Sequence, residues 1–162
     1  MRTRKETDGA VLAKARDLRL RTVRISDLLS DTCRFLDRYF EGAYSLENYI
    51  FTSRSVKISP TAFAGIIITV MKRVNGQSVL ELSSRLAERD FILTLNFDTG
   101  LMQKEEIAKI TALAADCGFE ISIYKSKIQL TSATVADREA IVRASQPRAV
   151  YRALCRALSS TT

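Results

Sequence analysis

The sequence of 162 residues contains no histidine and no tryptophan. Histidine is the side chain that most often moves protons in catalysis near neutral pH. Its absence excludes Ser-His-Asp and Cys-His catalysis, zinc sites built on histidine, and phosphohistidine chemistry within this chain. The other residue types show no complete catalytic arrangement either, so we expect no catalytic residue and no metal site.

Cysteine is scarce, with single residues at Cys33, Cys117 and Cys155. Their number is odd and no two of them form a C-x-x-C pair, so we do not expect a disulfide framework. Free thiols in or near a core are the simplest interpretation. Such thiols persist in a reducing compartment, and we expect a cytoplasmic protein.

A long hydrophobic run is also missing. The longest, Ala62–Met71, is interrupted by Gly65 and Thr69 and has about half of the roughly 20 residues that a transmembrane helix needs. The charged N-terminus is not followed by the apolar stretch of a signal peptide. We therefore expect no membrane partner.

What is present fits one small folded domain, with 46% apolar and 27% charged residues. The formal net charge is +7, and it belongs to the two ends of the chain. Residues 1–24 carry a net charge of +5 and residues 137–162 carry +3, which leaves about −1 for the middle. Basic ends of this kind bind nucleic acid or acidic partners, or they are simply solvated helix faces.

Apolar residues recur at helical spacing in several segments. Long helices are expected over residues 26–40, 61–74 and 104–117, and shorter ones over 10–20, 136–144 and 148–158. Ser26 is a candidate N-cap, and Ser59 followed by Pro60 is a strong helix start. Gly118 is a suitable C-terminal cap for the third long helix.

The remaining apolar segments alternate as strands do. Strands are expected over residues 44–51, 55–58, 78–86, 91–97, 119–124 and 128–135. The last four form two hairpins because their links are short and polar. The first two are either a strand pair or one strand and a short extended segment. Helices and hairpins alternate, which predicts an α/β two-layer sandwich: a mixed, mostly antiparallel sheet covered on one face by helices.

Four segments together resemble a known family. VRISDLLSDTCRFL is similar to a first helix, and VKISPTAFAGIIITVMKRVNG to a signature helix that normally ends in an asparagine box. FILTLNFDTGLMQKEEIAKI is similar to a strand that leads into a D-x-G-x-G box, and FEISIYKSKIQLTSATV to the closing strands. On these segments, Val23 to Val135 resembles the ATP-binding domain of sensor histidine kinases, in the GHKL ATPase group with the Bergerat fold.

The resemblance implies a nucleotide site. In the family, an aspartate at a strand end binds the adenine amino group, nearby glycines let the backbone approach the nucleotide, and an asparagine binds Mg²⁺ under a long lid. Asp98 and Gly100 match the D-x-G positions, and Thr69 stands at the metal-binding asparagine. Met102 replaces the second glycine, and no glycine for a lid lies between Gly100 and Gly118. The D-x-G is equally the composition of a plain turn.

These observations lead to three hypotheses. The first is a catalytically inactive histidine kinase ATPase-like domain of residues 23–135, which needs no cofactor and acts in two-component signal transduction by binding a protein partner or itself. Its basic helical extensions would be residues 1–22 and 136–162. The second is a divergent nucleotide-binding protein that keeps weak ATP or ADP binding with Mg²⁺. The third is a nucleic-acid-binding module that uses the basic termini.

Overall fold

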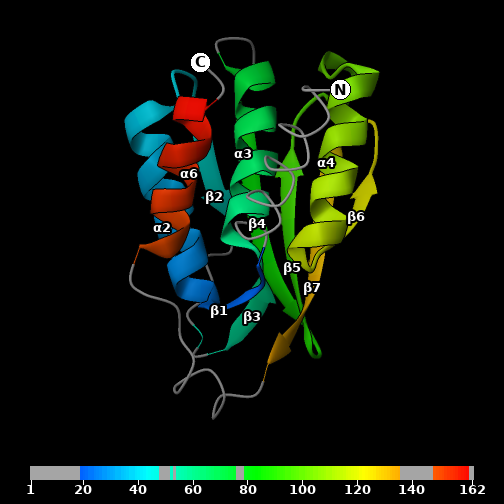
Figure 1. Ribbon diagram of the computed structural model, residues 1–162. Coiled ribbons are helices and arrows are strands. Elements are labelled where there is room, and N and C mark those ends of the chain that lie inside the picture. Colours follow the sequence, from blue (N-terminus) through cyan, green and yellow to red (C-terminus); the bar gives the residue numbers. More distant parts are fainter. Residues whose placement is uncertain (1–18, 48–51, 53, 76–78, 136–147, 161–162) are drawn as a thin grey trace, which may run out of the picture.

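The computed structural model describes residues 19–47, 52, 54–75, 79–135 and 148–160. The expected helix at 136–144 lies outside these residues, as does the one at 10–20 apart from Arg19 and Leu20. The elements are, in chain order, β1 (Arg21–Arg24), α2 (Ile25–Tyr39), β2 (Tyr44–Glu47), β3 (Ser55–Ile58), α3 (Pro60–Val74), β4 (Leu80–Ala87), β5 (Asp90–Asn96), a 3-10 turn η1 (Thr99–Leu101), α4 (Lys104–Cys117), β6 (Glu120–Ile123), β7 (Lys127–Val135) and α6 (Ala149–Ser160) (Figure 1).

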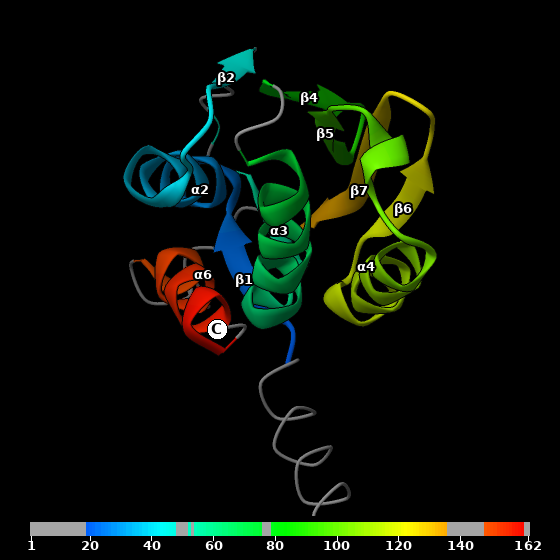
Figure 2. The ribbon, with the colours of Figure 1, turned by 90° about the horizontal axis from the view of Figure 1, so that it is seen from above.

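The strands form one seven-stranded sheet in the order β1-β3-β7-β5-β4-β2, and β6 also pairs with β7. All pairs are antiparallel except β2 with β4, which are parallel. Helices α2, α3 and α4 lie on one face of this sheet (Figures 1 and 2). The predicted two-layer α/β sandwich with a mixed, mostly antiparallel sheet is therefore confirmed.

The sheet register follows the alternation of the sequence. Leu82 of β4 pairs with Leu95 of β5, which pairs with Ile128 of β7, and all three side chains are buried beneath the helices. The next positions along the strands belong to the opposite face, where Thr94 is paired with Gln129. Successive side chains along each strand thus alternate between an apolar face of the sheet, under the helices, and a polar face on the other side.

Helix α3 is the centre of the helical layer. It starts as predicted, with Ser59 Oγ accepting a hydrogen bond of 3.1 Å from the Ala62 amide and with Pro60 in the first turn. Most of its residues are buried. The reason is that α3 packs on the sheet and also against α4 on one flank and α6 on the other (Figure 2).

Two predictions near the N-terminal side are wrong. Helix α2 begins at Ile25, one residue before Ser26, and its N-cap position is Arg24 without a side-chain cap. The cause is β1, which sequence reasoning missed: it pairs with β3 and runs directly into the helix, so the Ile25 amide bonds to the Arg54 carbonyl at 3.1 Å.

The strand-pair interpretation of residues 44–51 and 55–58 is also wrong. β2 and β3 are both strands, but β2 pairs in parallel with β4 at one edge of the sheet. β3 lies between β1 and β7, near the opposite edge. The partners of both strands come from distant parts of the chain, which a local pattern does not reveal. Residues 48–51 lie outside the described part.

The C-terminal helix α6 packs on the outside of α2 and α3. Figure 2 shows it farther from β4 and β5 than either of those helices. Its inward side chains Val150, Ala153 and Leu154 are buried. The carboxylate of Asp31 on α2 accepts a hydrogen bond of 3.2 Å from the Tyr151 amide, and so satisfies a free N–H group in the first turn of α6.

Replacing Asp31 by Ala should lower the free energy of unfolding by about 1 kcal/mol, because the first turn of α6 loses an acceptor. Asp31→Asn keeps a side-chain oxygen and should lower stability by less than Asp31→Ala does.

Burial raises the pKa of Asp31 above its ordinary value, despite the opposing hydrogen bond from Tyr151. The folded state therefore binds this proton more tightly than the unfolded state does. The stability that protonation adds is fully present below the ordinary value of 3.8 and is lost as the pH rises through the raised value.

Urea unfolding of both variants beside the native chain, at neutral pH and at about pH 4, measures these effects. Relative to Asp31→Asn, the native chain should gain stability at the lower pH. An Asn variant that follows the native chain at both pH values would contradict the pKa direction. An Ala variant as stable as the native chain would contradict the cap.

Candidate functional site

The Asp98-Thr99-Gly100 segment forms the junction between β5 and α4. Asp98 Oδ1 accepts a hydrogen bond of 2.9 Å from the Gly100 amide, and the Asp98 carbonyl accepts one of 3.1 Å from Leu101. These bonds make Asp98 the N-cap of the 3-10 turn η1. One carboxylate oxygen is therefore used locally, although the Asp98 side chain is exposed to solvent. A carbon added at Gly100 would lie 3.0 Å from that same oxygen.

The same junction is tied to the turn between β6 and β7. Thr99 is buried, its amide bonds to the Lys125 carbonyl at 3.1 Å, and its hydroxyl lies 2.6 Å from the Tyr124 carbonyl oxygen. Met102, where the family has its second glycine, is buried in the core. The hydrogen bonds at this junction are thus those of a well-anchored turn.

Thr69, the third predicted site residue, lies on α3. Its hydroxyl donates a hydrogen bond of 2.7 Å to the Gly65 carbonyl, one turn earlier in the same helix. The side chain is 7% exposed. The structure therefore brings Asp98 and Gly100 together by a hydrogen bond, and it gives Thr69 a partner within its own helix instead.

Helix α4 covers the side of α3 on which Thr69 lies. At one end of this side, Gly65 faces Leu113, whose Cδ1 would be only 2.8 Å from a Cβ at Gly65. At the other end, Arg73 Nε lies 2.6 and 2.7 Å from the two carboxylate oxygens of Glu106. Gly65, Thr69 and Arg73 are spaced by four residues and share one helix face. We call this set the α3–α4 seam.

The ion pair of the seam also stabilises the start of α4. Glu106 Oε1 accepts a hydrogen bond of 2.8 Å from the Gln103 amide, which makes a capping box. Burial acts to raise the pKa of Glu106, but the hydrogen bonds from Arg73 and the Gln103 amide outweigh it, so the pKa lies below its ordinary value. The carboxylate is therefore charged at neutral pH. It pairs with Arg73 of α3 and accepts the amide hydrogen bond at the start of α4.

The residues at these positions do not fit a Mg²⁺-nucleotide. The metal needs several oxygen ligands at about 2.1 Å, and the Thr69 hydroxyl is bound to Gly65. Among the residues that the structure describes, no group of three or more acidic, Cys or His side chains could hold a metal ion. One turn to either side of Thr69, Leu113 packs against Gly65 and the Arg73–Glu106 pair joins α3 to α4.

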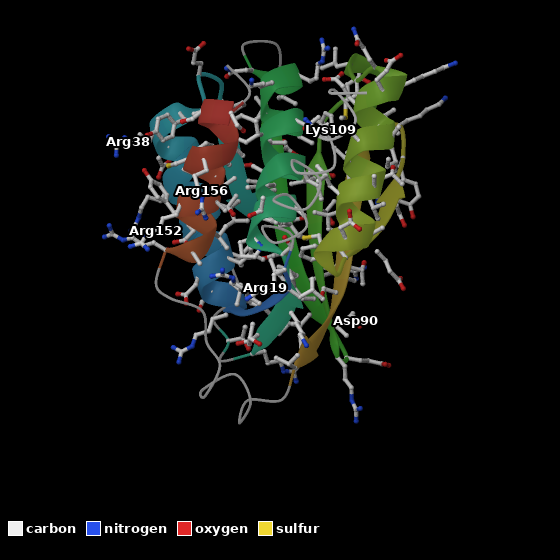
Figure 3. All side chains as sticks on the ribbon, in the orientation of Figure 1. Arg19, Arg38, Asp90, Lys109, Arg152 and Arg156 are labelled. Atoms are coloured by element: carbon white, nitrogen blue, oxygen red, sulfur yellow. The ribbon has the colours of Figure 1, made fainter. Side chains whose placement is uncertain are left out.

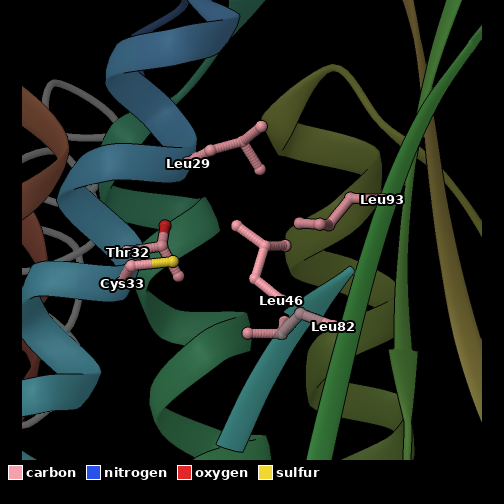
Figure 4. A pocket seen from close by; sticks show the side chains of 6 residues that line it. All are labelled: Leu29, Thr32, Cys33, Leu46, Leu82 and Leu93. Atoms are coloured by element: carbon pink, nitrogen blue, oxygen red, sulfur yellow. The ribbon is translucent and has the colours of Figure 1, made fainter. Parts of the chain in front are cut away.

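A narrow crevice lies elsewhere, between α2 and the sheet. It is lined by Leu29, Thr32, Cys33, Leu46, Leu82 and Leu93 (Figure 4). Its walls are apolar and it is too narrow to hold a water molecule. It is a packing gap of the core, and the Thr32 hydroxyl beside it already donates a hydrogen bond of 2.7 Å to the Leu28 carbonyl.

No protein-family model matches the sequence, and no curated protein matches it either. Among solved structures, the chain is similar to the histidine kinase AdeS of Acinetobacter baumannii, with 13% identity, a TM-score of 0.47, and coverage of 83% of this chain and 80% of that one. It is also similar to the cytoplasmic segment of the histidine kinase QseC, with 10% identity, a TM-score of 0.41, and coverage of 70% and 76%. At these identities the likeness concerns the fold alone. No helix in the described ranges is long and apolar enough to cross a membrane.

Sequence reasoning singled out Thr69 but missed the other residues of the seam and their partners on α4. Gly65 carries the available signal, because an isolated glycine inside an apolar helix often marks a close helix–helix contact. The pairing of Arg73 with Glu106 had no local signal, since 33 residues separate them.

Proposed function

We propose that this chain is a catalytically inactive domain of the histidine kinase ATPase fold, which acts in signal transduction as a regulatory or protein-binding module. The observation that carries the proposal is the α3–α4 seam. Leu113 packs into the space left by Gly65, and the Arg73–Glu106 pair joins the same two helices. With the metal-ligand position covered in this way, the domain would act through its surface.

The D-x-G turn supports the same proposal. The Asp98 carboxylate caps its own turn, and the buried Met102 side chain stands where a glycine would let the backbone approach a nucleotide. Asp98 and Met102 therefore both stabilise the folded domain, one as a cap and the other as a core residue. The rival hypothesis, a divergent nucleotide-binding protein, requires Asp98 to hold adenine through its exposed oxygen.

Calorimetric titration with ATP and ADP, with and without Mg²⁺, tests the proposal. We expect no Mg²⁺-dependent binding tighter than about 1 mM, which corresponds to roughly −4 kcal/mol. The informative variant is Asp98→Asn, and the matched control is Glu105→Gln, which removes one exposed carboxylate on the neighbouring first turn of α4. Micromolar binding that Asp98→Asn abolishes and Glu105→Gln preserves would overturn the proposal and establish the nucleotide-binding alternative.

A further inference from the structure

Helix α6 carries a row of arginines on its outer side. Arg148 precedes the helix, and Arg152 and Arg156 follow at intervals of four residues, which is about one turn. All three are exposed, and no acidic residue occurs within α6. Arg38 of α2 joins the row, because its Nη1 lies 3.4 Å from the Tyr151 hydroxyl on α6. Figure 3 shows Arg38, Arg152 and Arg156 on the α2–α6 side of the molecule. We call these four residues the arginine face.

In the described part of the chain, the arginine face lacks an ion-pair partner. Among the described residues, no carboxylate forms an ion pair with any of its four members, and the one ion pair found there joins Arg73 to Glu106 on the other side of α3. The nearby Asp31 is buried beneath α6 and bonds to the Tyr151 amide.

The row is also unfavourable for α6 itself. Like charges four residues apart destabilise a helix by about 0.2–0.5 kcal/mol per pair, and positive charge near a helix N-terminus opposes the helix dipole. Arg148 in addition adopts a φ of 65°, a backbone conformation that favours glycine. An anion bound along this face would offset the two electrostatic effects.

The chemistry of the face indicates which anion it suits. A protein–protein interface has an apolar or aromatic centre, but the outward residues of α6 offer only charge and hydroxyl groups. The aromatic rings close by are engaged in packing: Tyr39 lies 4.9 Å from the Phe35 ring, and Tyr151 contacts Phe35 edge-on at 6.3 Å. Phosphate groups need charge alone, and guanidinium groups bind them in a bidentate manner.

We propose that the arginine face binds the phosphate backbone of a nucleic-acid strand without regard to base sequence. Arginines at successive turns of a rigid helix contact successive phosphates, and the overall charge of +7 adds long-range attraction. This proposal does not depend on the α3–α4 seam. Its test is therefore independent of the test for ATP binding.

The test is fluorescence anisotropy of a labelled single-stranded DNA of about 20 nucleotides, titrated with the full chain at several salt concentrations. Four phosphate contacts predict a slope of log K against log salt near −3, from about −0.7 for each contact. The double variant Arg152→Gln/Arg156→Gln should reduce the slope by about 1.4 and weaken binding roughly tenfold at low salt. The control is Arg85→Gln/Arg89→Gln, which removes two exposed arginines at the β4–β5 hairpin and should leave the slope nearly unchanged.

Three outcomes would overturn the proposal. The first is no binding even at low salt. The second is an equal loss of affinity in both double variants, which would show that net charge alone attracts the strand. The third is tighter binding of poly-glutamate than of the oligonucleotide, which would assign the face to an acidic protein. Unchanged circular dichroism of both variants ensures that a loss of binding is not a loss of folding.

Discussion

Replacing Gly118 by Ala should lower the free energy of unfolding by about 3 kcal/mol or more, because backbone strain and a steric overlap add together. Gly118 ends α4 with a φ of 92°, a left-handed conformation that costs other residues about 1–2 kcal/mol. A Cβ at this position would lie 2.5 Å from the Lys57 carbonyl oxygen, which belongs to the backbone of β3. That oxygen cannot move without disturbing the sheet, so strain and steric overlap act together.

The junction around Gly118 has other fixed contacts that would resist a shift. The Ser59 amide bonds to the Cys117 carbonyl at 2.9 Å, and the Cys117 thiol lies 3.3 Å from the Ser59 carbonyl oxygen. These bonds connect the end of α4 to the start of α3. Relieving the overlap at Gly118 would therefore displace both helices relative to β3.

Urea unfolding of Gly118→Ala beside Gly100→Ala makes a matched comparison of the same chemical change. At Gly100 a Cβ would meet only the movable carboxylate of Asp98 at 3.0 Å, so we expect a cost below about 1 kcal/mol. Equal losses in the two variants would show that glycine is not specifically required at the end of α4.

Replacing Leu154 by Asp should release α6 from the domain. Leu154 is fully buried where α6 packs on α2 and α3. Removal of a buried leucine side chain costs about 2–5 kcal/mol, and an uncompensated buried carboxylate adds several more. Detachment of α6 avoids the second cost by placing the carboxylate in water.

Thiol labelling separates release of α6 from global unfolding. Cys155 lies on α6 and is half-buried, whereas Cys117 is buried and its pKa is raised to about 12 by that burial. In Leu154→Asp we expect fast labelling of Cys155 with Cys117 still protected. The control Arg156→Asp introduces the same residue at an exposed position of α6 and should leave both thiols at their native rates. Fast labelling of both thiols in Leu154→Asp would mean that α6 is indispensable to the whole fold.

Much of the fold could be predicted because its signals are local. The start of α3 follows from the Ser59 hydroxyl and the fixed φ of Pro60, and the end of α4 follows from Gly118. Each signal involves residues within one turn of one another, so a single stretch of sequence contains both partners. The long hairpin strands β4, β5 and β7 were foreseen for the same reason, through their alternation.

The candidate site could be predicted only in part. The sequence identified Asp98 and Gly100 as a D-x-G pair and Thr69 as a replacement for an asparagine. It did not show that the Asp98 carboxylate caps its own turn, or that Leu113 packs against Gly65 beside Thr69. These contacts depend on how two helices approach each other, and the approach is set by side chains dozens of residues apart.

The sequence by itself excluded histidine-based chemistry within this chain and predicted every described α-helix and all strands except β1, because composition, capping and periodicity act within a few residues. Only the tertiary structure decided that β2 joins the sheet in parallel at its edge, that Asp31 accepts a hydrogen bond from the first turn of α6, and that Leu113 of α4 packs against Gly65, one turn from Thr69. The free energy of each of these contacts comes from burial and hydrogen bonding between residues distant along the chain. Such contacts exist only once the sheet and its helices have packed together.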